Sequence, residues 1–137
     1  MGVLTDYFLA SPSDLAAISS TGEVPPKAPR IQYKGFGVVE LGYLTKQLGL
    51  KGSGVPAGQP EIAAADFSWF VLPLTADLVA ALAALDDAKV DKAAAALSKK
   101  KGVDLAKSDL TSLLSALAGL ARQAKPGMLG LHLWTSA

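Results

Sequence analysis

His132 is the single histidine of this 137-residue chain and its only conventional general base at neutral pH. Leucines alternate with Gly130, His132 and Trp134, and this period of two predicts a terminal strand that presents these three residues on one face. Paired with Ser68 or an aspartate, the imidazole would make a small hydrolase. No Gly-x-Ser-x-Gly elbow occurs, and a lone histidine beside a tryptophan is more often packed or hydrogen-bonded at a sheet face. The sequence therefore favours a structural role for His132.

Metal and cofactor chemistry has little support in the residue types. The chain has no cysteine, and one histidine cannot form a multi-histidine metal site. Gly35-Phe36-Gly37 follows a predicted strand, as a dinucleotide-binding turn would, but Glu40 stands where that fingerprint has its third glycine. The glycine-rich run 52–58 lacks the Gly-Lys-Ser/Thr ending of a phosphate-binding loop. We therefore expect no metal, no cofactor and no catalytic residue.

The charge balance bears on the class of partner. Thirteen Lys and Arg against 12 Asp and Glu give a net charge of +1, which supplies no drive toward nucleic acid or anionic lipid. The first six residues contain no Lys or Arg, unlike a secretory signal. The longest apolar span, 67–85, is interrupted by Pro73 and Asp77. We expect a cytoplasmic protein that binds neither nucleic acid nor membrane.

These side chains must be positioned by a fold, and 137 residues that are 50% apolar predict one globular domain over 1–137. Gly and Pro concentrate near 21–29 and 50–60, which predicts flexible loops in both places. Strands are expected at about 2–9, 30–36, 67–72 and 129–134, from aromatic and β-branched runs or from period-two alternation.

Helices are expected between these strands and in most of the second half. Ser11 followed by Pro12 predicts a helix start that runs to about residue 19, and leucine spacing predicts helices over 38–48, 75–85, 86–101 and 108–124. The order is β-α-β-α-β-α-α-α-β, an α+β fold with a sheet of about four strands. Its helices pack mainly from the C-terminal half, the helix 108–124 covers the sheet, and the first and last strands lie centrally or side by side.

The two ends of the chain carry a resemblance to a known family. Met1 to Phe8, followed by a Ser-Pro-Ser-Asp-Leu helix start, and Leu131-His132-Leu133-Trp134 after a long helix resemble small uncharacterised bacterial proteins of the YfbM type. The motifs cover about a sixth of the residues and belong to the framework. The resemblance implies a bacterial origin and supports the order of elements, and it implies no activity and no site residue.

The remaining hypotheses concern function. Because no complete catalytic or cofactor motif is present, we expect a non-enzymatic protein-binding module, such as an immunity or inhibitor-like protein, with another protein as its partner. The alternative is a small hydrolase or small-molecule-binding protein that uses His132. A homo-oligomer is compatible with the sequence. Aromatic and basic residues beside the two loops predict a partner surface, which comprises Tyr33, Lys34, Phe36, Tyr43 and Lys46. Tyr33 and Phe36 are also suited to packing in a core.

Overall fold

The computed structural model describes residues 4–56 and 60–136, and these form an antiparallel sheet with helices on both faces. The fold is α+β, as expected. The elements in chain order are β1 (Leu4–Ala10), α1 (Pro12–Thr21), β2 (Arg30–Lys34), α2 (Val38–Gln47), β3 (Ile62–Ala63), β4 (Trp69–Pro73), α3 (Ala76–Ala83), α4 (Asp87–Ser98), α5 (Lys107–Gln123) and β5 (Gly130–Ser136).

The sheet has the strand order β2-β1-β5-β4-β3, and every neighbouring pair is antiparallel. β1 and β5 lie side by side in the interior of the sheet, and in their register Phe8 stands opposite His132. This confirms the expected adjacency of the first and last strands. It also places His132 between two neighbouring strands, because Pro73 of β4 stands opposite it on the other side.

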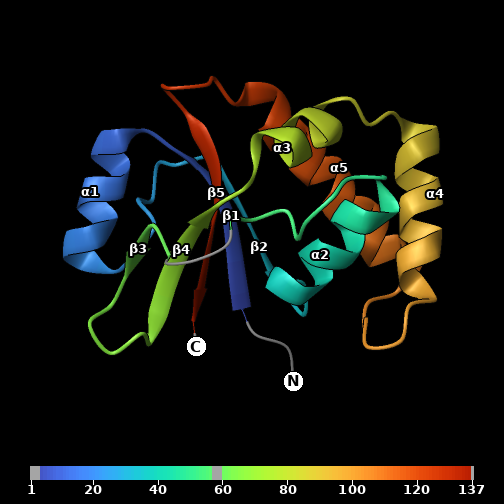
Figure 1. Ribbon diagram of the computed structural model, residues 1–137, viewed down its shortest axis with the longest axis horizontal. Helices are drawn as coiled ribbons and strands as arrows, with labels where there is room; N and C mark the ends of the chain where they lie inside the picture. Colours follow the sequence, from blue (N-terminus) through green and yellow to red (C-terminus); the bar gives the residue numbers. More distant parts are fainter. Residues whose placement is uncertain (1–3, 57–59, 137) are drawn as a thin grey trace.

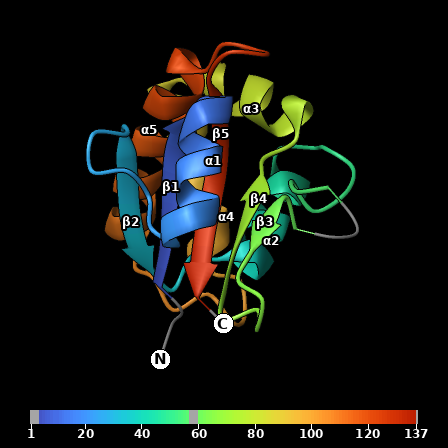
Figure 2. The same ribbon diagram turned by 90° about the vertical axis from the view of Figure 1, so that its left-hand side faces the viewer.

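Alternation along β1 and β5 sends their side chains to two separate cores. Tyr7 and Leu9 join the larger core beneath α2 to α5, whereas Phe8 and Ala10 join the smaller core beneath α1. The same period of two applies to β5. Figure 1 shows α1 on one side of the sheet and the other four helices on the opposite side, and Figure 2 shows α1 lying across the front of β1 and β5.

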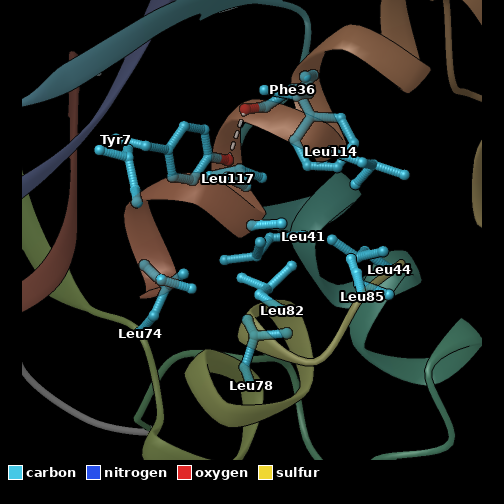
Figure 3. Close-up of a cluster of buried hydrophobic side chains, with 14 of the residues drawn as sticks. Tyr7, Phe36, Leu41, Leu44, Leu74, Leu78, Leu82, Leu85, Leu114 and Leu117 are labelled. Atoms are coloured by element: carbon cyan, nitrogen blue, oxygen red, sulfur yellow. Dashed lines mark hydrogen bonds between the residues drawn. The ribbon is translucent and has the colours of Figure 1, made fainter. Parts of the chain in front are cut away.

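Most buried residues of the larger core are leucines, and many of them come from α2, α3 and α5 (Figure 3). Leu117 of α5 is fully buried, which agrees with the expectation that this helix covers the sheet. One polar contact crosses this core, where the Tyr7 hydroxyl donates a hydrogen bond of 2.8 Å to the carbonyl oxygen of Phe36. Burial of the hydroxyl, with a smaller contribution from the nearby Glu40 carboxylate, raises the pKa of Tyr7 far above its ordinary value.

The helix starts follow local side-chain chemistry. The Ser11 hydroxyl accepts from the backbone N–H of Asp14, and the Asp14 carboxylate accepts from the N–H of Ser11. The Glu40 carboxylate accepts from the N–H of Gly37 at 2.8 Å, so the acid that interrupts the glycine fingerprint fixes the start of α2. Within the described residues, no helix is long and apolar enough to cross a membrane.

Two details differ from the sequence-based expectation. The sheet has five strands, because Ile62 and Ala63 pair with Val71 and Phe70 as the short strand β3. Two residues are too few to show a period in the sequence. Phe67, expected inside a strand, lies instead in the turn between β3 and β4, where it has a φ of 56° and is 54% exposed.

The expected loops at 21–29 and 50–60 contain no helix or strand beyond the last residue of α1 among their described residues. Residues 57–59 of the second loop, and residues 2 and 3 of the first expected strand, lie outside the described part of the chain.

Candidate functional site

A cleft of about 650 Å³ opens where β4 ends and β5 begins, between α3 and the end of α5. This volume is within the range of roughly 300–1,000 Å³ that is typical of small-molecule sites. Nearly all of the lining is apolar. Of the described residues that line the cleft, Glu61 and His132 alone have polar side chains.

Small side chains on two helices create the hollow. Ala76, Ala80 and Ala83 recur at a spacing of four and three, so they share one face of α3, and Ala121 and Ala124 face the cleft from the end of α5. A methyl group fills little of the space beside a helix. Larger residues at these positions would close the cleft, and its volume therefore depends directly on the alanines.

His132 is held rigidly at the wall of the cleft. Its side chain is 7% exposed, and its ring stacks on that of Phe8 with the centroids 5.7 Å apart. Nδ1 lies 2.9 Å from the carbonyl oxygen of Gly130. Because a carbonyl only accepts hydrogen bonds, this contact assigns a hydrogen to Nδ1.

The other ring nitrogen faces a carboxylate. His132 Nε2 lies 3.3 Å from Oε2 of Glu61, whose side chain is 40% exposed. With the Nδ1 hydrogen directed to Gly130, a neutral imidazole and an ionised carboxylate would present two acceptors to each other. The contact is favourable when one further proton is held between these atoms, and the two side chains then form an ion pair or its neutral equivalent.

Gly130 gives the imidazole its position. A Cβ atom on this residue would lie 2.9 Å from Cε1 of His132, which is closer than side-chain carbons approach in folded proteins. The absence of a side chain therefore lets the ring lie over the Gly130 backbone and bond its carbonyl oxygen.

The structure places the candidate nucleophile far from the histidine. Ser68 immediately precedes β4, whose first residue Trp69 pairs with Ser136, while Pro73 at the other end of that strand pairs with His132. At about 3.3 Å per residue, Ser68 is roughly 16 Å from Pro73 along the strand. The carboxylate that does contact His132 is Glu61. The sequence did not identify Glu61 as this partner. The two residues lie far apart in the chain, and their contact forms only when the strands pair.

The residues of the expected partner surface are divided by the fold. Phe36 is fully buried in the larger core, so it is not accessible to a partner. Tyr33 is half-buried against that core and donates to the carbonyl of Asp109, and Lys34 is exposed at the end of β2. Tyr43 and Lys46 lie together on α2.

Tyr43 and Lys46 line a groove between α2 and α4 that we call the lysine groove. It consists of two adjoining hollows of about 250 and 220 Å³ that share Gln47. Its ammonium groups come from Lys46, Lys89, Lys92 and Lys100, and no carboxylate is found among the described residues that line it. Lys100 Nζ lies 4.9 Å from the centre of the Tyr43 ring, which is cation–π geometry.

In the described part of the chain, no three His, Asp or Glu side chains gather as metal ligands. Among the described residues, the cleft and the lysine groove are two places where recognition chemistry gathers. No protein-family model, no curated protein and no solved structure matches this chain.

Proposed function

We propose that the protein binds a small, largely apolar molecule in the cleft between α3, α5 and β5. The supporting observation is the pairing of an apolar hollow of about 650 Å³ with a single polar point, formed by His132 and Glu61. Small-molecule sites have this composition, because apolar walls supply affinity and a few polar groups fix the orientation. With one water occupying about 30 Å³, the cleft takes a ligand of up to about 20 non-hydrogen atoms.

The test uses the neutral fluorophore N-phenyl-1-naphthylamine, whose emission rises in apolar surroundings. We expect saturable binding to the wild-type protein and a loss of at least about tenfold in affinity for Ala80→Phe, whose ring fills the cleft. Ala80 is solvent-exposed, so this change leaves the core intact. Ala17→Phe, at an exposed position of α1, is the matched control and retains binding. Equal affinity in Ala80→Phe and the wild-type protein would contradict the proposal.

The lysine groove favours a second function, which is binding of an acidic segment of another protein. Four lysines without a lining carboxylate complement a run of Asp or Glu, and Tyr43 offers an aromatic contact. Binding of a glutamate oligopeptide, followed by fluorescence anisotropy, is expected to weaken in Tyr43→Ala, Lys46→Glu and Lys100→Glu. Lys27→Glu makes the same charge reversal at an exposed position outside the groove. If it weakens binding equally, net charge and not the groove is responsible.

A further inference from the structure

We propose that the ligand of the cleft is an aliphatic carboxylic acid, and that Glu61 occupies the position of its carboxylate until the ligand enters. This inference rests on the proposed small-molecule function and adds the chemical class of the ligand. It follows from an asymmetry between the two polar residues of the cleft. One of them is fixed and the other is free to leave.

His132 is the fixed member of the pair. Its ring is stacked on Phe8, bonded to the Gly130 carbonyl and attached to a strand that is paired on both sides. Moving this ring would break the stacking and the hydrogen bond. The ring of His132, a residue that lines the cleft, is therefore fixed in position.

Glu61 is the displaceable member. It directly precedes β3, which has only two residues and pairs on one side with β4. Its side chain is 40% exposed, against 7% for that of His132. The carboxylate can therefore rotate into solvent at little cost, whereas the imidazole cannot.

Departure of Glu61 leaves the buried Nε2 of His132 without its polar partner at an apolar cleft. A buried polar group without a partner is unfavourable, so the vacated position favours a group that repeats the carboxylate contact of Glu61. A ligand carboxylate restores the contact that Glu61 made, while its aliphatic chain covers the alanines and leucines of the wall. An ammonium group carries the opposite charge to the Glu61 carboxylate, and an alcohol carries none.

Three probes with the same chain separate these possibilities, namely decanoate, decan-1-ol and decan-1-amine. Isothermal titration calorimetry of the wild-type protein is expected to rank decanoate first. Glu61→Gln removes the competing carboxylate. The affinity for decanoate is expected to rise by at least about threefold, because the form in which the position beside His132 is vacant becomes more populated. The affinity for decan-1-ol should change by less than about twofold. Glu23→Gln, an exposed carboxylate away from the cleft, is the control and leaves all three affinities unchanged.

A second readout reports on the His132 ring directly. Because His132 is the only histidine, the imidazole nitrogen signals in ¹⁵N NMR belong to it alone. In Glu61→Gln, decanoate should restore the Nε2 signal of the wild-type protein, and decan-1-ol should not. A preference for the amine, or equal affinity for acid and alcohol in Glu61→Gln, overturns the carboxylate inference while the cleft remains a binding site. Failure of all three probes overturns the proposed function as well.

Discussion

At Gly130, the lack of a single methyl group determines where the imidazole of His132 lies. Gly130→Ala forces the ring away, because the new Cβ would lie 2.9 Å from Cε1. We expect the His132 ring signals to shift in NMR and binding of the cleft probe to weaken. Gly119→Ala is the opposite case, since its Cβ would meet open space in the middle of α5. The free energy of unfolding of that variant should rise by about 0.5–1 kcal/mol, and its His132 ring signals should be unchanged. Unchanged ring signals in Gly130→Ala would show that this glycine does not position the histidine.

The residues of the site were partly predictable. Alternation along the last strand is a local property, so it placed His132 correctly on the face shared with Gly130 and Trp134. The contact with Glu61 depends on the pairing of three strands and on a two-residue strand that leaves no periodic signal. The burial of Phe36 had a similar origin. Its aromatic side chain suits an interface as well as a core, and only the packing of α2 and α5 decides between them.

At the scale of elements, the central helix α5 is expected to be intolerant of charge on its buried face. Leu117→Asp places an unpaired carboxylate in the core, at a cost of several kcal/mol that is comparable with the stability of a domain this size. Circular dichroism should show the protein unfolded at room temperature. Ser115→Asp adds the same charge on the exposed side of the helix and should shift stability by less than about 0.5 kcal/mol. A Leu117→Asp protein with an unchanged melting temperature would contradict the burial of this face of α5 in the core.

The start of α4 offers a comparison between a helix cap and a surface ion pair. The Asp86 carboxylate accepts from the N–H of Lys89 at 2.8 Å, and Asp86→Ala should cost about 1 kcal/mol. Asp91 pairs with Lys107 at 2.9 Å, but both side chains are largely exposed, so Asp91→Ala should cost less than about 0.5 kcal/mol. Urea unfolding followed by circular dichroism measures both. The reverse ranking would mean that the α4 start is not held by its cap.

The helices were more predictable than the sheet, for a physical reason. Caps, leucine spacing and proline positions act within a few residues, so α1, α2 and α5 could be placed from the sequence to within a few residues. Strand pairing joins residues far apart in the chain. Hence the order β2-β1-β5-β4-β3 could not be derived from the sequence beyond the adjacency of the first and last strands. The turn at Phe67 was missed because a run of aromatic residues continues through it.

At the scale of the whole molecule, the deep burial of Tyr7 couples folding to alkaline pH. The pKa of Tyr7 in the folded protein is raised far above its ordinary value, first by burial and then by Glu40. Above about pH 10 the unfolded chain therefore releases a proton that the folded protein retains. Since the unfolded state then binds fewer protons, the free energy of unfolding falls as pH rises, by up to about 1.4 kcal/mol per pH unit.

Tyr7→Phe isolates this effect. At neutral pH the variant should lose about 1 kcal/mol, because the Phe36 carbonyl loses its buried donor. Above about pH 10 the variant should lose stability less steeply than the wild-type protein, because the residue that retains its proton only when folded is gone. Urea unfolding at a series of pH values gives both slopes. Tyr43→Phe, which leaves Tyr7 in place, should keep the steep decline. Parallel slopes for the wild-type protein and Tyr7→Phe would show that alkaline unfolding is driven from another part of the molecule.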